Sequence, residues 1–317
     1  MILLITGKDV FFAMDTVSIN SITRLRIHAD GEGVRSVLFL QGCPLDCFWC
    51  CNPETRFGNT YRKLTDQQLY SYIREDVPYF LFSGGGVTFS GGEPLLQADF
   101  IRRFVQNHCG GFTIDIETSL YAPWETVESL IPHIQLWNVD FKVFDDSLHR
   151  EYTGKSNRRI LDNIRRLVRT AGPDRVLITY PVIPGCNDSR ENTARMISFM
   201  KEVGLDRIEV HPYRKGCEEK HRKLGKVTRE IPELSPEQYR SILEMFRNNG
   251  ILPVQRGSLF GKEKCEYLKA LRRDICNIWK LNVDIAECEI TEGCIGTCPR
   301  CEQELHEITL KKDRKSM

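Results

Sequence analysis

The sequence has neither a long hydrophobic run at its start nor a marked excess of charge. Its opening apolar run, residues 1–5, ends before polar Thr6 and charged Lys8. Such a run is too short for the hydrophobic region of a secretory signal or for a membrane span. The net charge of +1 at pH 7 gives no indication of nucleic-acid binding. We therefore expect a cytoplasmic protein with no membrane or nucleic-acid partner.

Cysteine, by contrast, is abundant, with 13 residues in a chain of 317. In the cytoplasm thiols are kept reduced, so these cysteines are more naturally free thiols, many of them metal ligands, than disulfides. The length and the 41% of apolar residues are sufficient for one large domain with an appendage.

Three of the cysteines directly follow an apolar β-type run at residues 37–40. Cys43, Cys47 and Cys50 are separated by three and then by two residues. Three thiolates on one short loop can hold three irons of a [4Fe–4S] cluster, and the absence of an obvious fourth ligand nearby leaves one iron open to a substrate. A structural zinc site would instead need four ligands, commonly as two cysteine pairs. Cys51 breaks the spacing and is interpreted as a neighbour, not a ligand.

Strand-like apolar runs alternate with helix-like segments between about residues 21 and 255. The predicted strands are 36–41, 86–90, 112–117, 135–141, 175–182, 206–212 and 251–254. Parallel strands with crossover helices imply an α/β sheet curved into a full or partial barrel, with its chemistry at the carboxyl ends of the strands. Residues 1–20 then form an N-terminal segment and residues 256–317 a C-terminal extension.

Two helices show start and stop signals. Asn157 is the expected N-cap of one helix, which ends before Gly172, and Asn187 or Asp188 is the expected N-cap of another, which ends before Gly204.

Glycines and charged residues follow the other predicted strands. The run 83–92 is rich in glycine, which lets a backbone approach a ligand closely, and Glu93 beside it can bind an amino group. Glu117 and Asp140 lie near two further strand ends. Alternation along a strand places Asp140 and Lys142 on the same face. The alternative interpretations are a plain turn for the glycine run and an internal salt bridge for Asp140 and Lys142.

Taken together, these segments resemble a known family. Residues 30–43, the cysteine triad, Gly91-Gly92-Glu93-Pro94 and the stretch 140–142 are similar to radical S-adenosylmethionine (SAM) enzymes of the glycyl-radical-enzyme activating group, which includes pyruvate formate-lyase activating enzyme. The resemblance covers about residues 20–255. It implies a partial (β/α)6-type barrel of the compact type, because only about 35 residues separate Cys50 from Gly86 and leave no room for a ferredoxin-like insert.

The resemblance also implies cofactors, partners and contacts. The free iron of the cluster would bind SAM, and a flavodoxin or ferredoxin would supply the electron. Cys43, Cys47 and Cys50 would be the cluster ligands. The implied SAM contacts are Trp49 beside the adenine, Gly91, Gly92 and Glu93 at the methionine amino group, Asp140 and Lys142 at the same end of the barrel, and Glu117, which would join Asp140 at a monovalent cation site beside the SAM carboxylate. Such a site suits oxygen ligands.

Two positions depart from the family pattern. Glu32 stands where the family has a proline in Asp-Gly-Pro-Gly, so a charge replaces a rigid turn residue. Arg214 follows Pro212-Tyr213 where relatives carry a histidine, whereas this chain has His211 before the proline. Neither His211 nor Arg214 is therefore included among the expected SAM contacts.

The C-terminal extension holds six of the cysteines. Cys294, Cys298 and Cys301 repeat the spacing of the first triad, and Cys288 lies six residues upstream as a possible fourth ligand. Four thiolates would form a closed site, suited to an auxiliary iron–sulfur cluster or to zinc. Thiols without a metal remain the third interpretation.

Three functional hypotheses follow. The first is an anaerobic activating enzyme that cleaves SAM reductively to a 5′-deoxyadenosyl radical and removes hydrogen from a backbone glycine of a partner glycyl radical enzyme. The second is a radical SAM enzyme that modifies a peptide or a small molecule with help from a C-terminal cluster. The third is a non-catalytic carrier of metal or clusters.

Overall fold

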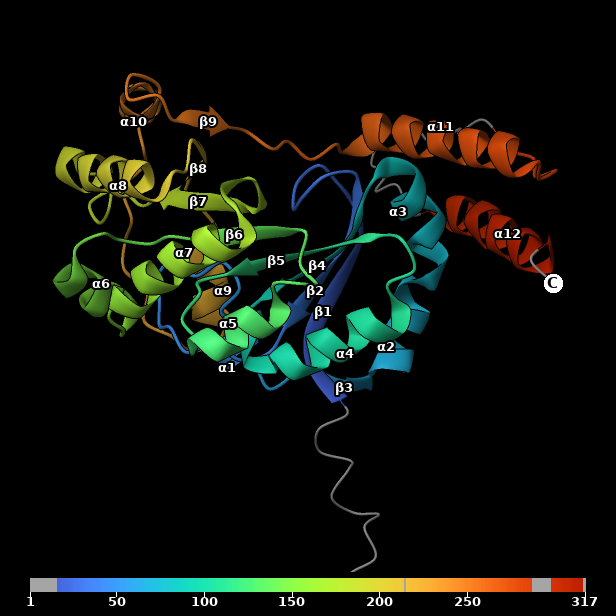
Figure 1. Cartoon of the computed structure of the whole chain (residues 1–317), viewed down its shortest axis with the longest axis horizontal. Coiled ribbons are helices and arrows are strands. Elements are labelled where there is room, and N and C mark those ends of the chain that lie inside the picture. Colours follow the sequence, from blue (N-terminus) through green and yellow to red (C-terminus); the bar gives the residue numbers. More distant parts are fainter. Residues whose placement is uncertain (1–15, 214, 287–297, 316–317) are drawn as a thin grey trace, which may run out of the picture.

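The computed structural model describes residues 16–213, 215–286 and 298–315, and it is built around one curved sheet (Figure 1). Its strands, in the spatial order β3-β1-β2-β4-β5-β6-β7-β8-β9, run parallel from β2 onward, while β1 lies antiparallel to β2 and to β3. The strands are β1 (Thr16–Ile27), β2 (Val34–Leu40), β3 (Arg62–Thr65), β4 (Gly86–Gly91), β5 (Thr113–Thr118), β6 (Leu136–Asp140), β7 (Val176–Val182), β8 (Arg207–Pro212) and β9 (Leu252–Val254).

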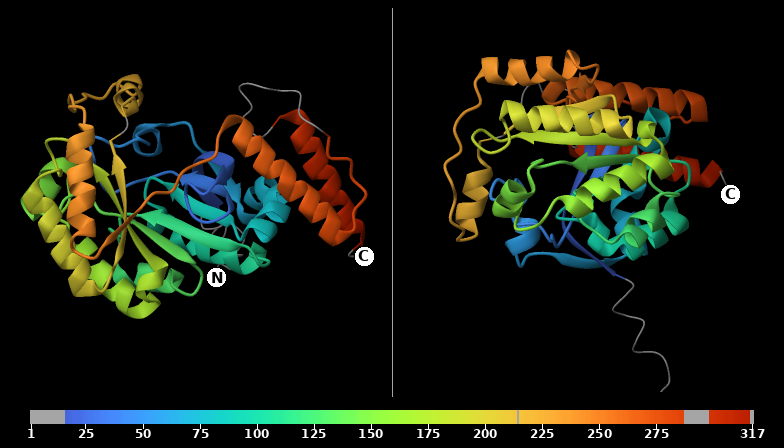
Figure 2. Two further views of the ribbon diagram at one scale, coloured as in Figure 1. Left: turned by 90° about the horizontal axis from the view of Figure 1, so that it is seen from above. Right: turned by 60° about the vertical axis from the view of Figure 1, so that its left-hand side comes forward.

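The crossover connections between the parallel strands carry most of the helices, which cover one face of the sheet (Figures 1 and 2). The helices are α1 (Glu54–Phe57), α2 (Asp66–Ile73), α3 (Val77–Ser83), α4 (Ala98–His108), α5 (Trp124–Leu130), α6 (Asp146–Thr153), α7 (Arg158–Ala171), α8 (Arg190–Val203), α9 (Cys217–Lys223), α10 (Pro236–Arg247), α11 (Gly261–Trp279) and α12 (Pro299–Lys315). The larger hydrophobic core lies between the sheet and α2, α4, α5, α7, α8 and α10. No helix among the described residues is long and apolar enough to cross a membrane.

The architecture confirms the predicted α/β partial barrel. All seven predicted strands occur, with ends within two residues of those expected. The antiparallel strands β1 and β3 were not predicted. The middle of β1 carries polar residues, such as Asn20 and Arg24, that interrupt the apolar pattern. β1 also runs across the boundary expected between residues 20 and 21.

The structure confirms the position of one expected helix cap and corrects the other. Asn157 occupies the N-cap position of α7, but its side chain donates instead to the carbonyl oxygens of Val143 and Phe144. α8 is capped by Ser189, whose hydroxyl accepts from the backbone N–H of Asn192. Asn187 is buried and donates to the carbonyl oxygens of Lys142, after β6, and of Pro181 in β7. In both cases the asparagine satisfies buried backbone groups, which are costly to leave unpaired.

Helices α11 and α12 form the C-terminal extension and pack beside α3 (Figures 1 and 2). A second, smaller hydrophobic core joins them to the end of β1 and the start of β2, where Ile27 and Val34 are fully buried. In this contact the Arg272 side chain is fully buried. It forms an ion pair with Glu304 at 2.8 Å and donates to the Tyr79 hydroxyl at 2.6 Å. The extension is therefore fixed to the end of β2 opposite the cysteine triad.

Replacement of Arg272 by Met should lower the free energy of unfolding by about 3 kcal/mol, because it leaves the buried Glu304 carboxylate without its nearest cation. Urea unfolding of the reduced protein measures this loss. Lys262→Met on the same helix is the control, since Lys262 is exposed and its ion pair with Glu266 spans 3.6 Å; the change should stay within roughly 0.5 kcal/mol. Equal losses in the two variants would contradict the assigned role of Arg272.

Candidate active site

A cavity of about 640 Å³ lies at the carboxyl ends of the parallel strands, where this class of fold places its chemistry. The loops that follow β2, β4, β5, β6, β7, β8 and β9 all contribute to its wall. Nine of the ten residues expected at the cluster and at SAM line it, namely Cys43, Cys47, Trp49, Cys50, Gly91, Gly92, Glu117, Asp140 and Lys142. Glu93 is the exception. The volume is within the range of ordinary small-molecule sites, which run from about 300 to 1,000 Å³.

The cysteine triad lies on the loop between β2 and α1, referred to below as the cluster loop (residues 41–53). Backbone hydrogen bonds hold its start and its middle, because Gly42 N–H donates to the carbonyl of Thr55 at 2.7 Å and Asp46 N–H donates to the carbonyl of Thr153 at 2.7 Å. Burial raises the pKa of Cys43 to about 12 and also raises the pKa of Cys47 and of Cys50. The thiols therefore need bound positive charge to ionise, and iron supplies such charge.

The spacing of the thiols also fits a cluster. Among the described residues, no group of three His, Cys, Asp or Glu side chains converges closely enough to hold a single metal ion. Three thiols around one cavity, none of them joined to another, are what a larger group with several irons requires. The residues present therefore fit a [4Fe–4S] cluster.

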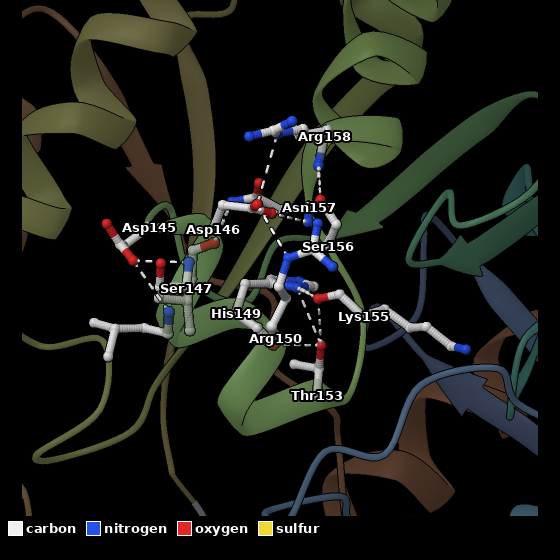
Figure 3. Close-up of polar contacts among 12 residues, drawn as sticks. Asp145, Asp146, Ser147, His149, Arg150, Thr153, Lys155, Ser156, Asn157 and Arg158 are labelled. Carbon is white, nitrogen blue, oxygen red and sulfur yellow. Dashed lines mark hydrogen bonds and ion pairs between the residues drawn. The ribbon is translucent and has the colours of Figure 1, made fainter.

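Helix α6 supports the cluster loop from outside, and a polar network fixes its connection to α7 (Figure 3). Asp146 accepts from the Ser156 hydroxyl at 2.5 Å and from the Asn157 N–H at 3.1 Å. His149 Nδ1 lies 2.6 Å from the Lys155 carbonyl oxygen. The carbonyl of Thr153, at the end of α6, then receives the hydrogen bond from Asp46 of the cluster loop. This network therefore fixes the position of α6 against the cluster loop.

Asp140 and Lys142 point into the cavity together, and the Lys142 ammonium lies 2.8 Å from the Asp140 carboxylate. Phe141 between them is buried in the core, as the predicted alternation requires. Burial opposes the charge on Lys142, but the attraction of Asp140, together with that of Cys47 and Cys50, raises the pKa of Lys142. The pair therefore forms an internal salt bridge and also lines the cavity, while its contact with SAM stays a prediction.

Glu117 is the second carboxylate of this wall and accepts a hydrogen bond from the Ser90 hydroxyl. Burial, followed by repulsion from Asp30, raises the pKa of Glu117 to about 8, and Asp140 adds to the repulsion. Glu117, Asp30 and Asp140 all line the same cavity. This part of the wall is therefore rich in oxygen atoms that would be stabilised by a cation.

Glu93 does not face the cavity, and its carboxylate is engaged by the protein itself. It accepts from the Thr118 hydroxyl at 2.5 Å and from Ser119 through the hydroxyl at 2.5 Å and the N–H at 2.9 Å. The Leu95 N–H adds a bond at 3.2 Å. The structure thus places Glu93 behind Thr118 and Ser119, which do line the cavity. The expected contact of Glu93 with SAM stays a prediction.

The primary role of Gly91 and Gly92, beside Glu93, is to allow close packing of backbone segments. A Cβ on Gly92 would lie 2.0 Å from the carbonyl oxygen of Gly42, and one on Gly91 would lie 2.4 Å from the Leu40 nitrogen. Gly91 also has a φ of +103°, which favours glycine. These positions must be glycine so that the end of β4 can lie against the start of the cluster loop.

Arg256 lines the cavity, although no feature of the sequence led us to expect it there. Arg256, in the connection from β9 to α11, donates to the Glu209 carboxylate at 2.7 Å, and His211 Nε2 lies 3.5 Å from the same carboxylate. Burial opposes ionisation of Glu209, but these two partners lower its pKa. Glu209 and His211 alternate on β8, which indicates a shared face. No signal singles out Arg256, and Arg214 lies outside the described residues.

Cys51 is not a free thiol, because it forms a disulfide with Cys217 at the start of α9. The expectation of reduced cysteines is therefore wrong for this pair in the structure as described. Only the tertiary fold brings these two cysteines together, since they lie 166 residues apart in the sequence.

The tail cysteines are only partly described. Cys298 and Cys301 lie one helical turn apart where α12 begins, and Arg272 Nη2 lies 3.5 Å from the Cys301 sulfur. Cys288 and Cys294 lie outside the described residues. The four-ligand tail site therefore stays a prediction.

Comparison with known proteins extends these observations. Residues 37–197 match the model of the radical SAM superfamily. A pyruvate formate-lyase-activating enzyme from Staphylococcus epidermidis is 33% identical over 237 residues, 71% of this chain and 93% of that protein. A (2S)-3-sulfopropanediol dehydratase activating enzyme from Klebsiella oxytoca is 31% identical over 270 residues, 65% of this chain and 84% of that protein.

Among solved structures, a radical SAM methyltransferase from Sphaerobacter thermophilus superposes with a TM-score of 0.54 at 18% identity, covering 76% of this chain and 77% of that one. This similarity extends to the fold alone. Together with the matched family model and the arrangement of the cavity, the comparisons show that the chain is an enzyme of the radical SAM superfamily.

Proposed function

We propose that this protein activates a glycyl radical enzyme by removing a hydrogen atom from a backbone glycine of that partner. The observation that carries the proposal is the single cavity that gathers Cys43, Cys47 and Cys50 with the expected SAM contacts. The names of the relatives, both activating enzymes, support this choice of substrate. When bound, the cluster and SAM supply one-electron chemistry that forms the 5′-deoxyadenosyl radical.

The protein's part is to position these groups and to exclude water. Trp49 is 4% exposed and lies at the cavity wall, where an aromatic face suits the adenine of SAM. Lys142, held by Asp140, provides a fixed positive charge near Cys47. Glu117 and Asp140 provide carboxylate oxygens, to which we assign a monovalent cation beside the SAM carboxylate.

The opposite rim of the cavity provides the entrance for a partner. Arg26 and Asp30, joined by an ion pair at 2.5 Å, line the same cavity as the connection from Arg256 to Phe260. Phe260 is 71% exposed at this rim. An exposed aromatic residue flanked by charged groups suits docking of a polypeptide segment. A flavodoxin or ferredoxin is the electron donor that completes the proposal.

The proposed function predicts that the anaerobically reconstituted and reduced protein produces 5′-deoxyadenosine from SAM. It also predicts a glycyl radical on the partner, visible by electron paramagnetic resonance. Cys47→Ala should abolish both signals, because one of three iron ligands is lost. Product analysis with candidate partners measures the first signal. Unchanged 5′-deoxyadenosine from Cys47→Ala would contradict the cluster assignment. SAM cleavage that modifies a peptide but no glycyl radical enzyme would favour the second hypothesis.

Glu93→Gln should weaken SAM binding by about tenfold, because its amide nitrogen would face the Ser119 N–H, and a difference of about 1.4 kcal/mol corresponds to that factor. Since the carboxylate is buried behind Thr118 and Ser119, the SAM-free variant should also unfold at a lower temperature. Isothermal titration and thermal unfolding measure the two effects. Exposed Glu128→Gln is the control. Weakened binding with unchanged stability would instead indicate a direct contact of Glu93 with SAM.

We also assign a second metal, as an iron–sulfur cluster or as zinc, to the tail cysteines. Arg272 contacts both Cys301 and Tyr79 of α3, so this site lies near the start of β2, whereas the triad follows the end of that strand. The seven residues of β2 span about 20 Å. A metal in the tail is therefore too far away to contact SAM, and it would serve electron delivery or the partner.

The double variant Cys298→Ser/Cys301→Ser should still form 5′-deoxyadenosine with a strong chemical reductant, because the tail lies away from the cavity. It should lose activity toward the partner when a protein supplies the electron. Metal analysis decides the identity of the tail metal, since lost iron and sulfide indicate a cluster and lost zinc indicates a structural site. Metal content equal to that of the unchanged protein would contradict a tail metal site.

A further inference from the structure

Helix α9 lies across the cluster loop and is joined to it by several contacts. The disulfide between Cys51 and Cys217 is one of them. The Lys220 ammonium donates to the Cys51 carbonyl at 2.6 Å and forms an ion pair with Glu54 at 2.9 Å. His221 Nε2 lies 2.8 Å from the carbonyl oxygen of Cys50, to which a protonated Nε2 donates. Cys217, Lys220 and His221, which lie within little more than one turn of α9, thus contact the third cluster ligand and the residues that follow it.

Neither cysteine of this disulfide has a part in the proposed cluster. The triad supplies its three ligands without Cys51, and Cys217 comes from the segment that follows β8. The pair also differs in exposure, because Cys51 is exposed whereas Cys217 is 7% exposed. Of the two residues, Cys51 is therefore the more open to an incoming thiolate.

We propose that Cys51 and Cys217 form a reversible redox site that exchanges with small thiols and disulfides and that fastens α9 to the cluster loop when oxidised. Disulfides that occur in reducing compartments are usually transient and serve catalysis or redox sensing. Because Cys51 directly follows a cluster ligand, a change in the oxidation state of this disulfide would act on the cluster loop.

The exchange needs no oxidant or reductant other than the small thiol, which is itself oxidised. A small thiolate attacks the Cys51 sulfur, the bond to Cys217 breaks, and Cys217 leaves with the electron pair and takes up a proton. A second thiolate then attacks the outer sulfur of the mixed disulfide and releases Cys51 as a thiol. Overall, one protein disulfide and two small thiols give two protein thiols and one small disulfide.

After reduction, the polar contacts described between α9 and the segment 50–54 are those of Lys220 and His221. The ion pair from Lys220 to Glu54 is partly exposed, and such pairs contribute little to stability. The reduced helix can then move away from the cluster loop, which exposes the backbone beside Cys50. The effect of reduction on the cluster rests on the proposed function. The redox site itself does not depend on it.

The first experiment uses the full chain without metal, equilibrated anaerobically in glutathione buffers of increasing oxidised fraction. After alkylation and proteolysis, mass spectrometry quantifies the peptide that joins Cys51 to Cys217. This peptide should appear in oxidising buffers and disappear reversibly in reducing ones. Recovery of both cysteines as alkylated thiols in every buffer, or their pairing with other cysteines, would overturn the proposal.

The second experiment follows iron release from the reconstituted protein to a chelator. In oxidising buffer Cys217→Ser should lose iron severalfold faster than the unchanged protein, and in reducing buffer the two rates should agree. Cys109→Ser is the matched control, because this half-buried cysteine lies at the end of α4 and its thiol bonds Phe112 outside the cavity.

Equal rates in oxidising buffer would show that the disulfide does not fasten the loop, which also overturns the proposal. A protein that binds no iron at all would contradict the proposed cluster instead. In that case the peptide analysis still decides the redox site, because it needs neither iron nor a substituted cysteine.

Discussion

The backbone contact between the end of β4 and the start of the cluster loop determines the geometry of the whole site. Gly92 N–H donates to the Leu40 carbonyl at 3.0 Å, and Glu93 N–H donates to Gly42 at 2.7 Å. These bonds form only because Gly92 has no side chain that would meet the Gly42 oxygen. The Glu93 carboxylate then holds Ser119 after β5. Three neighbouring strand ends are thereby fixed to one another before any cofactor binds.

The conformation of the loop between β1 and β2 depends on a buried arginine. Arg35 is 1% exposed, lies 3.2 Å from the Asp115 carboxylate and donates to the Thr88 hydroxyl at 2.7 Å. That hydroxyl donates in turn to the Asp30 carbonyl at 2.9 Å. Gly31 passes so close to Asp115 that a Cβ would lie 2.2 Å from its carboxylate. This packing orders the turn although Glu32 replaces the proline typical of the family.

The sequence predicted the parallel strands and nine residues of the cavity wall, because functional residues follow strands whose carboxyl ends share one edge. It could not predict the direction of Glu93, since a loop has no periodicity that distinguishes a buried side from an open one. Cys217 and Arg256 come from segments after β8 and β9, and their neighbours depend on the tertiary fold alone. For α7 and α8, buried carbonyl groups competed with the helix ends for the asparagine side chains.

The short connection from β9 to α11 has a mechanical consequence. Its Arg256 is bonded to Glu209 in the sheet, while the helix it enters is anchored beside α3 through the buried Arg272. A span of a few residues, tethered at both ends, has little slack, because chain length limits its reach. Any shift of the α11 and α12 pair relative to the barrel must therefore stretch or relax this span. The extension is thereby connected directly to the part of the cavity wall that Arg256 and Phe260 form.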